Sequence, residues 1–98
     1  MYFVVFASDK PDMEEVRAEV RSSHREYLRQ HEHPVKVLLG GPTLDKSAPV
    51  MNGTMLVIEA ERIEQVQDFI ADDPYSRANL FQLLEVRPWV WSLGAPEE

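Results

Sequence analysis

Cysteine is absent from the 98-residue sequence. This excludes disulfide bonds, thiolate nucleophiles and metal centres held by cysteine. A long apolar segment is missing too, because the longest apolar run near the N-terminus, residues 2–7, is too short to span a membrane. Residues 1–6 carry none of the positive charge that opens a secretory signal. We therefore expect a cytoplasmic protein that begins here and has no membrane partner.

Basic residues are scarce, with 10 Lys and Arg against 17 Asp and Glu, and the net charge is −7. Without a basic cluster, such a chain is not expected to bind nucleic acid or anionic membranes, whose phosphates demand neutralisation. Hydrophobic residues make up 44% of the chain, which is too many for disorder. We expect one domain over residues 1–98 that buries roughly 65% of its unfolded surface, so a partner subunit would help it.

The apolar pattern predicts four strands, at residues 2–7, 35–39, 54–58 and about 82–91. The first strand is almost entirely apolar, which is typical of a strand buried on both faces. Pro88 indicates that the far half of the last strand lies at an edge or a bulge. The stretch 40–53, with its glycines and prolines, predicts a long loop, and the tail 92–98 should be loose.

Two amphipathic helices are expected between these strands. The first begins at Asp12, which forms a capping-box-like pair with Glu15, and runs to about Gln30. The second ends at the sequence Asp72-Asp73-Pro74, because a residue before proline avoids helical dihedrals. A further helical turn is expected within residues 75–80. The second helix is marked by Ile63, Val66, Phe69 and Ile70.

The order strand, helix, strand, strand, helix, strand predicts an α+β protein, the split βαβ arrangement of ferredoxin-like folds with an antiparallel sheet. Two helices cover only one face of such a sheet. The strands are nevertheless apolar on both faces, so something apolar must cover the other one. The simplest cover is a second copy of the chain, with the two sheets packed face to face. The sequence therefore predicts a homodimer.

His24 is the candidate general base, since a histidine titrates most readily near neutral pH. It interrupts the apolar stripe of the first helix, so a core histidine bonded to a backbone carbonyl is the alternative. Arg21 lies three residues back on the same face, where it can bind an anion or simply be a surface charge. Ser23 adds a hydroxyl beside the imidazole. The stripe itself consists of Met13, Val16, Val20, Tyr27 and Leu28.

The other two histidines, His31 and His33, flank Glu32 before Pro34. This spacing is not the zinc motif of a helix, and exposed turn histidines are the preferred interpretation. A metal shared by His24 and His31 is conceivable from their seven-residue spacing but is not expected.

Asp72 and Asp73, at the end of the second expected helix, offer a candidate carboxylate partner for the imidazole. A carboxylate that accepts an imidazole N–H fixes the tautomer and stabilises the imidazolium. The alternative is that the aspartates at positions 72 and 73 simply end the second helix, although a carboxylate there opposes the macrodipole.

Gly40 and Gly41 permit close approach of a ligand to the backbone, and their N–H groups can meet an anion, although plain turn glycines are the alternative. No phosphate loop follows them. Trp89 and Trp91 lie two apart on the expected last strand, which favours packing or dimer contacts over a cofactor platform.

Four short motifs together resemble the YciI-like (YCII-related) family, in order and over most of the chain. They are Arg21-Ser22-Ser23-His24, Gly41-Pro42, Asp73-Pro74-Tyr75 and Val86-Arg87-Pro88-Trp89. The resemblance implies a dimeric α/β barrel of ferredoxin-like halves. It also implies a cleft with a catalytic His24–Asp73 pair, and with Arg21, Ser23, Gly41, Pro42 and Tyr75 against the substrate.

The resemblance implies proton transfer on a small ring or acid metabolite, because one branch of the family resembles dehydrochlorinases of chlorinated hydroxyquinols. His24 would be the base or acid, Asp73 would orient it, and Arg21 with the Gly41 backbone would hold an anionic oxygen. Neither a cofactor nor a metal is expected. The alternative is a non-catalytic module of the same dimeric fold, in which the pair merely anchors an acid.

Overall fold

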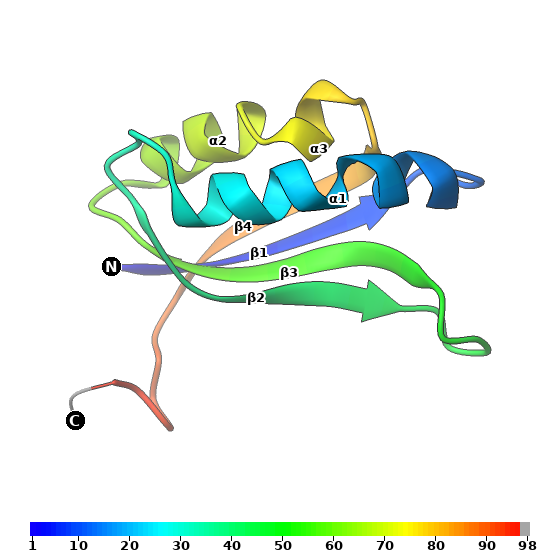
Figure 1. Cartoon of the computed structure of the whole chain (residues 1–98). Helices are drawn as coiled ribbons and strands as arrows, with labels where there is room; N and C mark the ends of the chain where they lie inside the picture. Colours follow the sequence, from blue (N-terminus) through cyan, green and yellow to red (C-terminus); the bar gives the residue numbers. More distant parts are fainter. Residues whose placement is uncertain (97–98) are drawn as a thin grey trace.

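The computed structural model describes residues 1–96. These residues form a four-stranded antiparallel sheet, in the order β2-β3-β1-β4, with all the helices on one face (Figure 1). The ferredoxin-like α+β fold predicted from the sequence is thus confirmed. In chain order the elements are β1 (Tyr2–Asp9), α1 (Glu14–Arg29), β2 (Lys36–Leu44), β3 (Met51–Glu59), α2 (Ile63–Ala71), α3 (Pro74–Arg77) and β4 (Phe81–Trp89).

The hydrophobic core lies between the sheet and the helices. Alternate residues of the two central strands, β1 and β3, point toward the helices, as the pleat of a strand requires. The apolar side chains of α2 pack on them because its apolar positions recur at helical spacing. The buried cluster consists of Phe3, Val5, Leu56, Ile58, Ala60, Val66, Phe69 and Ile70.

The start of α1 differs from the prediction. Asp12 does not cap the helix, because its backbone has a φ of 62°, in the left-handed region, whereas an N-cap residue is extended. Met13 occupies the N-cap position with no side-chain hydrogen bond, and Glu14 and Glu15 supply negative charge to the first turn. The C-terminal end at Arg29 lies within one residue of the predicted one.

The predicted long loop over residues 40–53 is wrong. Gly40, Gly41 and Pro42 continue β2, which pairs with β3 as far as Leu44, so only residues 45–50 connect the two strands. The reason is that β2 is an edge strand, where a proline can be accommodated because one side of the backbone needs no partner. Glycine and proline thus mark a special strand here rather than its end.

The last strand ends two residues earlier than predicted, at Trp89, and it is the other edge of the sheet, as Pro88 indicated. Trp91 lies beyond β4, with its ring 5.4 Å from that of Tyr2 and 5.2 Å from that of Trp89. Residues 92–96 form no helix or strand, and the rest of the predicted loose tail, residues 97–98, lies outside the described residues.

The sheet face opposite the helices is open in the single chain (Figure 1). The strand register places Phe6, Leu39 and Leu83 on this face, where they are 48%, 51% and 68% exposed. Val57, on the same face, is only 1% exposed because side chains of both neighbouring strands surround it. We call this surface the open face.

Substitution of two glycines on paired strands should lower stability to different extents. A Cβ on Gly53 would collide with the carbonyl oxygen of Ala7, whereas a Cβ on Gly41 would meet no atom within 4 Å. Gly53→Ala should therefore lower the free energy of unfolding by about 1–3 kcal/mol, and Gly41→Ala by less than about 0.5 kcal/mol. Urea denaturation of both variants measures this, and equal losses would contradict the strand register.

Candidate active site

The structure brings His24 of α1 against Asp73, which lies between α2 and α3. The two residues are 6% and 1% exposed, and Nδ1 of the imidazole lies 2.9 Å and 2.8 Å from the two carboxylate oxygens. An ionised carboxylate can only accept hydrogen bonds, so Nδ1 carries the proton and donates it to Asp73. The two side chains predicted to act together are therefore in direct contact across 49 positions of sequence.

The other ring nitrogen of His24, Nε2, faces a cavity. No hydrogen bond of the described residues reaches Nε2, and none of their side-chain nitrogens or oxygens is both buried and unpartnered. Nε2 is consequently accessible, and His24 is among the residues that line the cavity. With the proton held on Nδ1, the lone pair of neutral His24 lies on the accessible Nε2, which is the arrangement a base requires.

Asp73 has a second, structural role that the sequence analysis assigned incorrectly. Instead of ending α2 on the unfavourable side of its dipole, Asp73 is the N-cap of α3, with an extended backbone and Pro74 as the next residue. Its Oδ1 accepts a hydrogen bond of 2.9 Å from the backbone N–H of Tyr75. The same carboxylate therefore starts a helix and receives the imidazole N–H.

Tyr75 forms one wall of the pocket around the imidazole. Its ring stacks on that of His24 with the centroids 4.0 Å apart and an interplanar angle of 20°. Its hydroxyl accepts a hydrogen bond of 3.3 Å from Nη1 of Arg17. Burial raises the pKa of Tyr75 against the lowering effect of the nearby Arg17 and Arg21, so the hydroxyl stays protonated at neutral pH.

Arg17 is a residue of the site that the sequence analysis missed. It is 4% exposed and forms a two-pronged ion pair with Asp9, with Nε–Oδ2 and Nη2–Oδ1 distances of 2.6 and 3.0 Å. Nη2 also donates to Oγ1 of Thr54 at 2.8 Å, and the guanidinium lies over the Tyr75 ring at 4.5 Å. One side chain of α1 is thereby tied to β1, β3 and α3, in the geometry for which arginine is suited.

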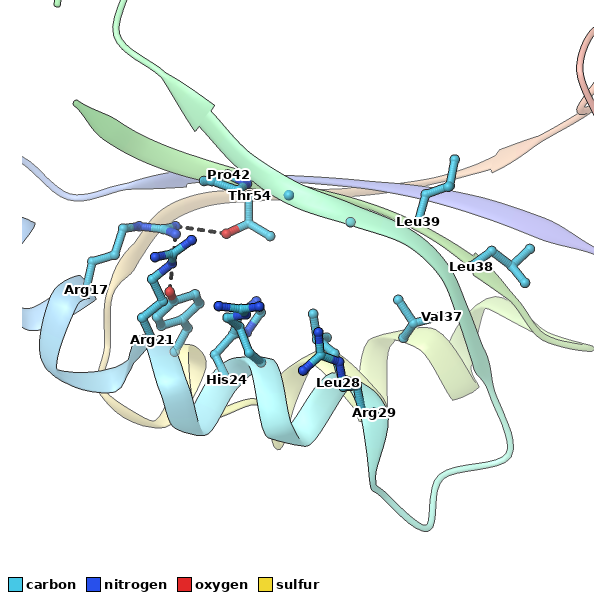
Figure 2. A pocket seen from close by; sticks show the side chains of 14 residues that line it. Arg17, Arg21, His24, Leu28, Arg29, Val37, Leu38, Leu39, Pro42 and Thr54 are labelled. Carbon is cyan, nitrogen blue, oxygen red and sulfur yellow. Dashed lines mark hydrogen bonds between the residues drawn. The ribbon is translucent and has the colours of Figure 1, made fainter. Parts of the chain in front are cut away.

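The cavity itself, of about 450 Å³, lies between α1 and β2 (Figure 2). Arg21, Gly41, Pro42 and Tyr75, the residues predicted to contact a substrate, line it together with His24. Ser23 does not line it and is exposed on α1, because it is one residue before His24 and so points about 100° away. The structure thus brings together all the predicted site residues except Ser23.

A bulge in β2 shapes the wall opposite α1. The pairing with β3 passes from Val37 directly to Leu39, so Leu38 is an extra residue without a partner in the ladder. Regular alternation would turn every second side chain away from the cavity. With the bulge, Val37 and Leu38 both line the cavity, whereas the pairing of Leu39 with Val57 turns the Leu39 side chain to the open face at the edge of the cavity.

His31 and His33 belong to a separate cluster and are not the exposed turn residues that the sequence favoured. Both are half-buried against Phe69, with ring centroids 4.6 and 5.7 Å away. His33 also contacts Asp72 through Nε2 at 2.8 Å. Within residues 1–96, no three histidine or carboxylate side chains converge as a metal site. The chain therefore has two adjacent aspartates, each paired with a different histidine, and only the pair with Asp73 reaches the cavity.

The fold and the site define a class: a small ferredoxin-like protein that presents an imidazole, oriented by a carboxylate, in a cavity beside its sheet. The model of the YCII-related domain matches residues 1–90, and the chain belongs to this family. No helix in the described part of the chain is both long and apolar enough to cross a bilayer.

Relatives cover nearly the whole chain. An uncharacterised protein of Haemophilus influenzae is 31% identical over 94 residues, and the protein YciI of Escherichia coli is 30% identical over 94 residues. In each case the match covers 91% of this chain and 96% of the relative.

A solved structure adds a named activity. The 5-chloro-2-hydroxyhydroquinone dehydrochlorinase TftG of Burkholderia phenoliruptrix, solved in complex with 2,5-dihydroxybenzoquinone, is 31% identical and superposes with a TM-score of 0.82. The match covers 92% of this chain and 94% of that one. A putative antibiotic biosynthesis monooxygenase of Bacteroides thetaiotaomicron, at 20% identity and a TM-score of 0.57, is similar in fold alone.

The buried ion pair of Arg17 should be needed for stability. Arg17→Met removes the only ion-pair partner that the described residues provide for Asp9, whose side chain is 7% exposed. Leaving a buried carboxylate unpaired should lower the free energy of unfolding by about 3–5 kcal/mol. The double variant Asp9→Asn/Arg17→Met removes both charges and should recover a large part of this loss. Chemical denaturation measures both, and equal losses in the single and double variants would show that the pair is not responsible.

Proposed function

We propose that this protein is a small cofactor-independent enzyme of the lyase, isomerase or dehydrochlorinase type, in which His24 transfers a proton on a small ring or acid metabolite. The observation that supports this most strongly is the arrangement of one imidazole. Its Nδ1–H is held by the buried carboxylate of Asp73, while Nε2 is accessible in a cavity. His24 and Asp73 together can act as a base without a metal or a cofactor.

Each step uses groups that line the cavity. Nε2 of His24 accepts a proton from the substrate, and Asp73 stabilises the imidazolium that forms. The negative charge that develops on a substrate oxygen meets the guanidinium of Arg21 and the backbone of Gly41. In an elimination, the electron pair of the bond that lost the proton then expels a leaving group such as chloride. In an isomerisation, the imidazolium returns the proton to another carbon of the substrate. Positioned proton transfer supplies about 10²- to 10⁴-fold of rate.

The likeness to TftG supports this class of reaction. That protein is a dehydrochlorinase by name and was solved with a dihydroxylated quinone, so a fold of this kind can bind a small oxygenated ring. The cavity of this chain offers such a ring the imidazole of His24, the guanidinium of Arg21 and an apolar wall. Hydroxyquinols, quinones and lactones are therefore the first compounds to offer. A cytoplasmic location remains our expectation for the enzyme.

Asp73→Asn should lower turnover by about 10²- to 10⁴-fold with little loss of stability. Asparagine keeps the shape and the N-cap of α3 but cannot compensate the imidazolium. Asp72→Asn is the matched control, since the neighbouring aspartate also pairs with a histidine but outside the cavity. Chloride release from 5-chloro-2-hydroxyhydroquinone, and product formation from quinones and lactones, measure the rates.

The same assay decides against the alternative of a non-catalytic binding module. Saturable binding of 2,5-dihydroxybenzoquinone without product from any compound of the panel would favour the module and contradict the enzyme. Equal rates for Asp73→Asn and Asp72→Asn would show that the His24–Asp73 contact is structural.

The enzyme is also a homodimer in this proposal, with the open faces of two sheets packed together. The exposed Phe6, Leu39 and Leu83 give this face the apolar character that a stable interface requires. Light scattering at micromolar concentration should give twice the chain mass of 11.3 kDa. Phe6→Glu should shift the mass to that of the monomer, because it places a charge in the centre of the interface. Lys46→Gln, in the connection between β2 and β3, is the control. A folded monomer of the unmodified chain would contradict the dimer.

A further inference from the structure

Four arginines follow one another along α1 at intervals of four residues. Arg17, Arg21, Arg25 and Arg29 each lie one turn and a small rotation beyond the last, so successive members rise by about 6 Å along the helix axis. All four line the cavity, which no aspartate or glutamate among the described residues lines. We call them the arginine row. Figure 2 shows Arg21 and His24 extending from α1 toward β2.

The arginine row is positively charged, whereas the chain as a whole is acidic. Arg17 is neutralised by its ion pair with Asp9. In contrast, no ion pair within residues 1–96 includes Arg21, Arg25 or Arg29. Three positive charges thus face one cavity of a protein with a net charge of −7.

We call Arg25 and Arg29, the two members of the row that follow His24, the outer row. The carboxylate best placed to neutralise them, that of Glu26, forms no ion pair with either. Glu26 stands three residues before Arg29, a spacing at which helical side chains can pair. The structure contains no ion pair between them, although Arg25 and Arg29, which line the cavity, also line a second, more open hollow together with Glu26. The outer row therefore keeps its donors available to an anion.

Position along the helix separates the row into two parts. Arg21 lies one turn before His24 and serves the reacting oxygen in the proposed function. Arg29 lies five residues after His24, about 7–8 Å further along the axis. Between them, Leu28 on α1 faces Val37 across the cavity, so the path from the imidazole to Arg29 is apolar along its sides.

The size of the cavity exceeds what a single ring needs. A closed cavity of about 150 Å³ holds a benzene-sized molecule. The cavity of this protein has about 450 Å³ and is within the range of pockets for larger ligands. A small ring at His24 would fill only its inner end and would leave the apolar wall and the outer row without contacts.

From this geometry we infer that the substrate carries a second anionic group, a carboxylate or phosphate at the end of a short apolar arm, which Arg25 and Arg29 bind. Guanidinium groups suit both anions because they donate paired hydrogen bonds to two oxygens. The inference rests on the proposed function for the position of the reacting end. It concerns binding alone, however, and no bond is made or broken at the outer row.

A set of matched probes tests the inference without turnover. The probes are 4-phenylbutyrate, 4-phenylbutyl phosphate and the neutral 4-phenylbutanamide, each with the same ring and arm, and benzoate, which has no arm. Calorimetry at low salt should show both armed anions binding at least about tenfold more tightly than the amide. The carboxylate and phosphate probes show which anion the row prefers. Affinity for them should fall with added salt, because Arg25 and Arg29 are exposed.

Substitutions of single arginines identify the residues that bind the anionic group of the probes. Arg25→Gln and Arg29→Gln should each weaken the armed anions by about three- to tenfold and leave the amide unchanged. Benzoate should be affected less by Arg29→Gln, since its carboxylate cannot extend to that turn. Lys46→Gln removes the same single charge away from the cavity and should change nothing.

Equal affinity for the anions and the amide would overturn the inference, as would equal effects of Arg29→Gln and Lys46→Gln. These outcomes leave the proposed reaction untouched, since that depends on the turnover of Asp73→Asn. Conversely, an inactive protein that binds the armed anions through Arg25 and Arg29 would retain the inference and contradict the proposed enzyme.

Discussion

The carboxylate of Asp73 is the group on which the site depends. It is almost completely buried, and a buried charge is stable only when its hydrogen bonds are satisfied. The imidazole of His24 and the backbone N–H of Tyr75 provide them from two different helices. The contact that orients the imidazole is therefore also one that holds α1 against α3. One carboxylate therefore contributes both to the geometry of the site and to the packing of the helical layer.

Arg17 connects the site to the sheet. Its guanidinium joins Asp9 at the end of β1, Thr54 in β3 and the hydroxyl of Tyr75, whose ring lies flat on His24. The imidazole is consequently fixed on one side by a carboxylate and on its face by a ring that the sheet itself positions. In the proposed reaction, rigid support of this kind would keep His24 within the narrow geometry that proton transfer demands.

Patterns within short segments predicted the fold well, and contacts between segments were predicted poorly. The order of strands and helices follows from apolar spacing and from Pro74, so the ferredoxin-like class was accessible. The loop over residues 40–53 was wrong because the tolerance of an edge strand for glycine and proline depends on sheet order, which a single sequence does not contain. The contact of His24 with Asp73 was anticipated through family resemblance rather than from the two residues themselves.

The residues of the site that were missed show the same limit. A lone arginine on a helix is normally a solvated charge, so Arg17 gave no sign of its burial. One signal was present: the fourfold repetition of arginine at intervals of four along α1, which places the series on one slowly turning face. Which members are neutralised and which remain free depends on Asp9, and only the folded chain shows that.

The two edges of the sheet share a feature with a consequence for the behaviour of the protein in a crowded cell. Pro42 lies on β2 and Pro88 on β4, and neither has an N–H to offer an incoming strand. The bulge at Leu38 further disturbs the pairing surface of β2. Sheets that display open, regular edges invite unlimited strand addition and fibrous aggregates. This chain instead has a proline on each edge strand, and its exposed Phe6, Leu39 and Leu83 lie on a face of the sheet, where no further strand can be added.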